Sequence, residues 1–90
     1  MYQIKKYSYD QAKKLNVKIE PSKRKYKKID VFTLDNKYIC SIGDSRYNDY
    51  PTYLEINKEA ADIHRERYWK RHQKENIEGT KGWYALKILW

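Results

Sequence analysis

Apolar and polar residues alternate most regularly in two neighbouring runs, Lys28–Leu34 and Lys37–Ile42. Alternation with a period of two is typical of strands that bury one face. Asp35 and Asn36, which join the two runs, both tolerate positive φ and suit a two-residue turn. The pattern therefore predicts an antiparallel β-hairpin, and Val17–Ile19 reads as a further short strand.

The N-terminal segment carries a helix signal. Ser8 followed three residues later by Gln11 is a capping-box pattern, which predicts a short helix from Tyr9 to about Leu15. Asn16 can close that helix in the left-handed conformation. The loose alternation before it, over Tyr2–Tyr7, predicts a short strand.

A longer helix is expected from Lys58 to about Glu75, with Asn57 as its N-cap. Residues four apart share one face of a helix. The stripe formed in this way contains Ala60, His64, Tyr68 and His72, flanked by Ala61 and Trp69. We expect the helix to pack this stripe on the hairpin.

The remaining segments complete the predicted fold. Arg46–Leu54 reads as a tyrosine-rich loop whose backbone is fixed by Pro51. Trp83–Trp90 is apolar enough to require burial, on this domain or on a partner. The predicted class is α+β: a small antiparallel hairpin or sheet packed against one long C-terminal helix, with a short N-terminal helix, in a single domain of residues 1–90.

The composition bears on the cellular compartment in which the protein is expected. Cys40 is the only cysteine, so no internal disulfide can form, which fits a reducing compartment. No apolar run approaches the ~18 residues of a membrane span, and the residues after Met1 lack the apolar centre of a signal peptide. We expect a cytoplasmic or virion-internal protein without a membrane partner.

Positive charge is concentrated in one part of the chain. Between Lys13 and Lys28 there are eight basic residues and one acidic residue, Glu20, a net charge of +7 out of the chain's +8. Charge at this density creates a field that attracts polyanions. The partner class that it predicts is nucleic acid.

The strongest local signal is Lys23–Lys28, where five cations surround Tyr26. Such cations neutralise phosphates, and a tyrosine among them can stack on a base or sugar. Because no sequence-reading motif is present, we expect contacts to the phosphate backbone. The candidate nucleic-acid-binding residues are Lys13, Lys14, Lys23, Arg24, Lys25, Tyr26, Lys27, Lys28 and Arg46. A solvated loop or a nuclear-targeting tract is the simpler alternative.

Other groupings carry weaker signals. His64 and His72 lie two helical turns apart, about 12 Å by helical rise, too far to ligate one metal together. Asp44 and Asp49 suggest a cation-binding pair of a nuclease, although a turn rich in Asp, Ser and Asn is their ordinary explanation. We assign no catalytic residue, no metal ligand and no cofactor.

Several motifs resemble an uncharacterised family of small basic proteins of large double-stranded DNA viruses and aquatic phages. They are Lys28-Ile29-Asp30-Val31-Phe32, Ser41-Ile42-Gly43-Asp44, Tyr47-Asn48-Asp49-Tyr50-Pro51-Thr52-Tyr53, the Tyr68…Arg71-His72 step, and Gly82-Trp83-Tyr84-Ala85…Ile88-Leu89-Trp90. The resemblance covers most of the chain from residue 17 onward. It implies a viral source, in the host cytoplasm or nucleus or in the virion, but no activity, ligand or catalytic residue.

Three hypotheses follow from these observations. The first is a small basic non-enzymatic protein that binds nucleic acid, DNA rather than RNA, through phosphate contacts. The second is a structural virion or interaction protein that docks on a viral partner, or on itself, through the aromatic tail Trp83–Trp90. The third is a small metal-dependent nuclease. The sequence does not decide whether the basic loop meets a genome or an acidic protein.

Overall fold

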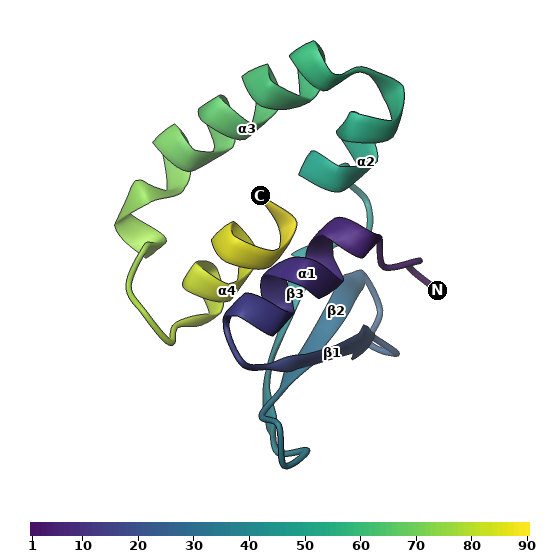
Figure 1. Ribbon diagram of the computed structural model, residues 1–90, viewed down its shortest axis with the longest axis vertical. Helices are drawn as coiled ribbons and strands as arrows, with labels where there is room; N and C mark the ends of the chain where they lie inside the picture. The colour runs from purple at the N-terminus through teal and green to yellow at the C-terminus, as the bar shows by residue number, and fades with distance from the viewer.

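Three strands and four helices make up the computed structural model, which describes residues 1–90. In chain order these are α1 (Lys6–Lys14), β1 (Lys18–Pro21), β2 (Lys27–Phe32), β3 (Tyr38–Asp44), α2 (Tyr50–Ile56), α3 (Lys58–His72), the 3-10 turn η1 (Gln73–Glu75) and α4 (Lys81–Leu89). The strands form one antiparallel sheet in the order β1-β2-β3 (Figure 1). The predicted α+β class is therefore confirmed. None of the helices is both long and apolar enough to cross a bilayer.

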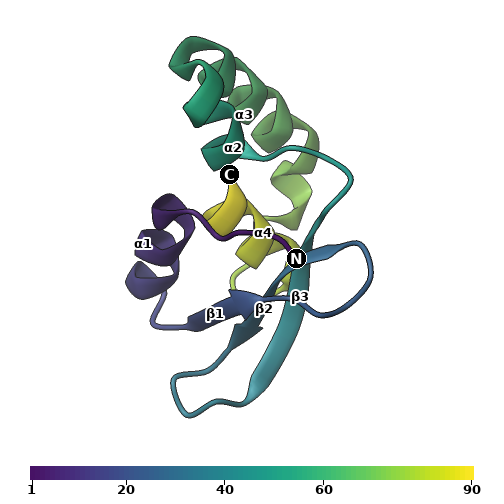
Figure 2. The same ribbon diagram turned by 90° about the vertical axis from the view of Figure 1, so that its right-hand side faces the viewer.

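The helices are stacked on the sheet in layers. α1 and α4 pack against each other, α1 also contacts β1, and α4 also contacts β3. The α2–α3 pair lies beyond them, on the side away from the sheet (Figure 2). The core sits between the sheet and the α1/α4 layer, and its centre contains Ile29, Val31, Ile42, Ile88 and Leu89.

The predicted hairpin is present and sets the register of the sheet. Ile29 pairs with Ile42, and Val31 pairs with Cys40 across β2 and β3. Ile29, Val31 and Ile42 have no exposed surface, as expected for strand residues that alternate toward a core. The predicted two-residue turn is wrong, because the N–H of Thr33 donates to the carbonyl of Lys37 at 2.8 Å and leaves three residues between them. The last of these, Asn36, has a φ of 70°, which asparagine tolerates better than most residues.

The N-terminal helix begins earlier than predicted. Ser8 does not cap it: the helix starts at Lys6, and the Ser8 hydroxyl donates a hydrogen bond of 2.9 Å to the carbonyl oxygen of Ile88 in α4. Because Ser8 is buried against α4, its hydroxyl donates to this distant carbonyl and does not accept from a local backbone N–H, as a capping residue would. The strand expected over Tyr2–Tyr7 is absent, and residues 1–5 have no regular structure. Asn16 closes the helix with a φ of 57°, as predicted.

The tyrosine-rich loop contains a helix that the sequence analysis missed. Pro51 lies in the first turn of α2, where its missing N–H is not needed. The carboxylate of Asp49 accepts a hydrogen bond of 3.0 Å from the backbone N–H of Thr52 and caps the helix. Pro51 therefore starts a helix here and does not merely fix a loop.

The long helix has the predicted extent but a different neighbour. Asn57 accepts a hydrogen bond of 3.0 Å from the N–H of Ala60, as expected of an N-cap. α3 packs against α2 and α4, however, and it is α4 that packs on the sheet. α3 buries only Ala61 completely, whereas α4 buries Leu86, Ile88 and Leu89. The apolar tail forms the more hydrophobic helix, so it takes the core position.

Candidate nucleic-acid interface

The basic loop between β1 and β2 is anchored at its base. The backbone N–H of buried Ser22 donates to the carbonyl of Lys28 at 3.0 Å, and the Ser22 hydroxyl accepts from the N–H of Arg24 at 3.1 Å. Tyr26 completes the loop with a φ of 65°. The loop projects from the molecule in Figure 2, and its four residues from Lys23 to Tyr26 are exposed.

Cations from two segments of the chain lie close to the ring of Tyr26. The guanidinium carbon of Arg46 lies 4.4 Å from the centre of the Tyr26 ring, and the ammonium of Lys25 lies 5.0 Å from it. The backbone N–H of Ser45 donates to the carbonyl of Tyr26 at 3.0 Å, which fixes the Arg46 segment beside the loop. The structure therefore brings Arg46 to the basic loop, as the sequence analysis expected.

One carboxylate faces this group of cations. Arg46 donates two hydrogen bonds to Asp44, from Nε to Oδ1 at 2.9 Å and from Nη2 to Oδ2 at 2.7 Å. These bonds lower the pKa of Asp44 to about 2. Asp44 is thus ionised at neutral pH and engaged by one guanidinium, which leaves the other cations of the loop without a carboxylate partner.

Lys81, at the start of α4, joins the group although the sequence analysis did not include it. The side chains of Lys27 and Lys81 lie against each other, and this contact lowers the pKa of Lys27, with partial burial and the charge of Lys81 adding to the effect. A cation in the first turn of a helix is also unfavourable for the helix dipole. Two adjacent ammonium groups at a helix N-terminus form an arrangement that a bound anion would stabilise.

Lys28 has a structural role in place of the predicted contact with nucleic acid. Its ammonium lies 2.7 Å from Oδ2 of Asp49, and the two side chains are only 4% and 1% exposed. The hydroxyl of Tyr2 donates to the same oxygen at 2.7 Å. Burial alone would raise the pKa of Asp49, but the hydrogen bond and charge of Lys28 outweigh it and lower the pKa. A buried, paired ammonium cannot reach a phosphate.

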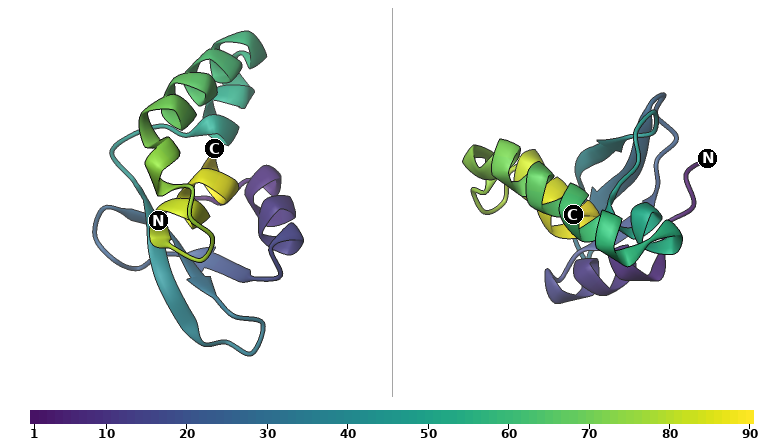
Figure 3. Two further views of the ribbon diagram at one scale, coloured as in Figure 1. Left: turned by 90° about the vertical axis from the view of Figure 1, so that its left-hand side faces the viewer. Right: turned by 90° about the horizontal axis from the view of Figure 1, so that it is seen from above.

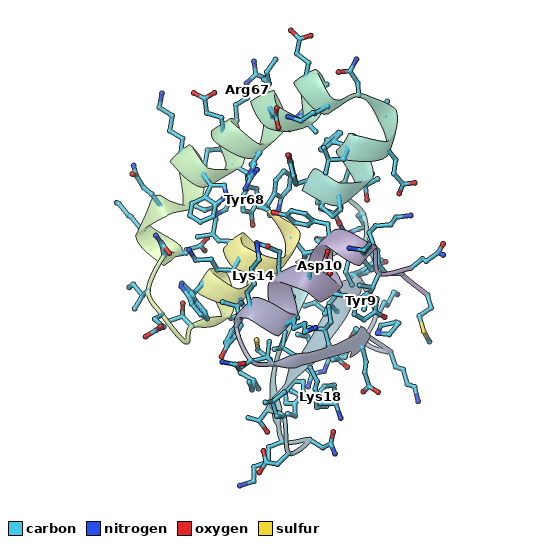
Figure 4. All side chains as sticks on the ribbon, in the orientation of Figure 1. Tyr9, Asp10, Lys14, Lys18, Arg67 and Tyr68 are labelled. Carbon is cyan, nitrogen blue, oxygen red and sulfur yellow. The ribbon has the colours of Figure 1, made fainter.

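Lys13 and Lys14 do not extend the patch either. They lie in the last turn of α1, and Figure 4 shows Lys14 there, with Lys18 nearby at the start of β1. α1 and the β1–β2 loop lie on opposite sides of the molecule in Figure 2 and in the left view of Figure 3. The candidate interface therefore consists of Lys23, Arg24, Lys25, Tyr26, Lys27, Arg46 and Lys81.

A cavity of about 270 Å³ opens next to this interface. Two stacked pairs of rings stand in its wall: Tyr53 on His64, with centroids 4.0 Å apart, and Tyr68 on Trp90, with centroids 4.2 Å apart. Figure 4 shows the Tyr68 side chain directed from α3 toward α4. The lining residues are Lys28, Gly43, Asp44, Tyr47, Asn48, Tyr53, His64, Tyr68, Arg71, Ala85, Leu89 and Trp90.

The cavity contains more free donors than acceptors. Arg71, His64 and Asn48 have no side-chain hydrogen bond or ion pair within the protein, whereas the Asp44 carboxylate is bound by Arg46. Tyr47 stands at this cavity with 70% of its surface exposed and without a ring partner. Most of the residues that line the cavity belong to the sequence motifs quoted above. These motifs lie far apart in the chain, and the fold brings them together around the cavity.

The four residues of the nuclease hypothesis do not form one metal site, although Asp44 and His64 line the same cavity. Asp44 is bound by Arg46 and Asp49 by Lys28, so each carboxylate has its own cation. His64 stacks on Tyr53, while His72 contacts Glu75 at 2.6 Å. No group of three His, Cys, Asp or Glu side chains is placed to hold a metal ion.

No protein-family model, curated protein or solved structure matches this chain. Its function has to be inferred from the residues of the site, and the resemblance to the viral family stays a prediction.

Proposed function

We propose that this protein is a non-enzymatic nucleic-acid-binding protein that contacts DNA phosphates through the β1–β2 loop. The observation that carries the proposal is a group of six cations on and beside the β1–β2 loop, two of them against the Tyr26 ring, with one carboxylate in an ion pair among them. The cations are Lys23, Arg24, Lys25, Lys27, Arg46 and Lys81, and the carboxylate is Asp44. Unpaired cations at this spacing repel one another, and phosphates would relieve the repulsion.

The geometry favours contact with the backbone of the nucleic acid over reading of base edges. The six cations lie on a loop and near the ends of β2, β3 and α4, and they do not follow one helix that could enter a groove. Tyr26, with 46% of its surface exposed, adds a ring that can stack on a base. We expect affinity to depend strongly on salt and weakly on sequence.

Two further considerations bear on the partner. The resemblance to proteins of double-stranded DNA viruses favours DNA over RNA. Three residues of the apolar tail that motivated docking on another subunit, Leu86, Ile88 and Leu89, have at most 1% exposed surface in this domain, while Trp83 and Trp90 are partly buried. A virion-protein partner is therefore supported less well than nucleic acid.

A pair of matched double variants tests the proposal. Lys23→Gln/Lys25→Gln removes two cations of the loop, and Lys13→Gln/Lys14→Gln removes two cations from the far side of the molecule. Both variants have the same net charge, so long-range attraction falls equally. Binding to a labelled duplex is measured by fluorescence anisotropy at several salt concentrations.

The loop variant should bind more weakly, and its slope of log affinity against log salt should shrink by about 0.9 for each lost phosphate contact. The α1 variant should keep the slope of the parent protein. Equal slopes for the two variants would show that the loop is not the contact surface.

A further inference from the structure

We propose that the cavity beside the interface binds one phosphorylated nucleotide, with Arg71 and His64 facing its phosphate and Tyr47 stacking on its base. The inference deepens the proposed function, on which it rests for the identity of the ligand. It assigns a second, more specific site to a protein whose loop contacts phosphates without selectivity.

The size of the cavity suits a small ligand. Its volume of about 270 Å³ lies just below the range of ligand pockets, which begins near ~300 Å³. A groove along several nucleotides would be longer and more open. The space therefore accommodates a single nucleotide, entering from the side of Tyr47 and Asn48, both of which are exposed.

The chemistry of the lining points to an anion. Arg71 provides a fork of donors suited to phosphate, and His64 provides a ring N–H from the same face of α3, two turns earlier. Asp44, the carboxylate that would repel a phosphate, is neutralised by two hydrogen bonds from Arg46. Lys28 also lines the cavity, but its charge is engaged by Asp49.

The aromatic side chains that line the cavity differ in how far other rings cover their faces. Tyr68 stacks on Trp90 and on His72, and the two contacts, at 4.2 and 4.1 Å, leave little of its faces open. Tyr53 has His64 on one face. Tyr47 stacks on no ring, so it is the residue free to stack on an incoming base.

The cavity is connected to the basic loop through Asp44. This residue lines the cavity, pairs with Lys27 in the register of the sheet, and binds Arg46, which covers the Tyr26 ring. A single strand lying along the loop therefore passes the mouth of the cavity and can insert one unstacked nucleotide. The same nucleotide chemistry is also available from free mononucleotides, and the experiment separates the two sources.

The test uses isothermal titration of the full chain with two probes, deoxyadenosine 5′-monophosphate and a 12-nucleotide single strand. Arg71→Gln removes the phosphate donor. Arg67→Gln is the matched control, because it removes the same charge one turn earlier on α3 from a side chain that points away from the cavity (Figure 4). The loop variant Lys23→Gln/Lys25→Gln reports on the proposed function separately.

Arg71→Gln should weaken binding of at least one probe by ~10- to 100-fold, as expected for loss of a bidentate charged contact, while Arg67→Gln stays near the parent value. If Arg71→Gln binds the mononucleotide more weakly, the ligand of the cavity is a free mononucleotide. If it binds only the single strand more weakly, the ligand is a nucleotide of the strand that inserts into the cavity. Equal behaviour of the two arginine variants, or no binding of either probe, overturns the proposal. A loop variant that still binds the strand normally refutes the proposed function but leaves the cavity intact.

Discussion

Breaking the buried pair of Lys28 and Asp49 should destabilise the fold more than any surface charge change. Lys28→Met would leave the Asp49 carboxylate with donors from Tyr2 and from the N–H of Thr52 but without a countercharge. Asp49→Asn would leave the Lys28 ammonium buried opposite a neutral amide. In both cases a charge stays in a site with 4% or less of exposed surface.

The magnitude follows from the environment of the pair. Removing one partner of a buried ion pair costs about 3–5 kcal/mol, because the other charge is left uncompensated. A domain of 90 residues has a total stability of about 5–14 kcal/mol. Each single variant should therefore lose about a fifth or more of the free energy of unfolding.

Urea denaturation followed by circular dichroism gives these free energies. The double variant Lys28→Met/Asp49→Asn should lose no more than either single variant, because it leaves no buried charge behind. Lys23→Met, an exposed lysine of the loop, is the control and should change stability by less than about 0.5 kcal/mol.

The reasoning fails if Lys28→Met is as mild as Lys23→Met, or if the two single losses simply add in the double variant. Either result would mean that Lys28 is solvated in solution. It would then be free to bind phosphate, as the sequence alone had suggested.

Four further outcomes are expected. Because the pKa of Asp49 is lowered from its ordinary value of 3.8, stability should fall in urea titrations as pH drops below about 4, and Asp49→Asn should flatten this loss. Burial and the hydrogen bond to Asp49 raise the pKa of Tyr2, so stability should also fall as pH rises past 10, and this loss should be smaller in Tyr2→Phe. Gly43→Ala should cost about 2–5 kcal/mol by thermal denaturation, since φ is +78° and the new Cβ would lie 2.7 Å from a Leu89 methyl. Gly79→Ala, at φ +86° with nothing within 4 Å, should cost only the backbone strain of about 1–2 kcal/mol.

Local signals predicted those elements that local interactions form. The hairpin around Asp35 and Asn36 and the cap at Asn57 each depend on residues a few positions apart. Ser8 fits a capping box but instead hydrogen-bonds Ile88, eighty residues away, which no local pattern could indicate. The packing of the long helix was predicted wrongly because spacing identifies a face but not the neighbour that covers it.

Only part of the candidate site could be predicted, because some of its contacts join segments that are far apart in the chain. The density of charge identified the loop, and Arg46 was included as a further basic residue that could extend the patch. Lys28 continues the same basic run, but its side chain is buried in an ion pair with Asp49, 21 residues further along the chain. Lys81 and the cavity around Arg71 depend on contacts between segments far apart in the chain, so composition and spacing could not reveal them.

The most direct test of the central claim is a salt titration of the unmodified protein with a labelled DNA duplex. About four to five phosphate contacts from the six cations of the interface predict that log affinity falls linearly with log salt, with a slope of about −4. A slope near zero, or no binding at low salt, would contradict the proposed function.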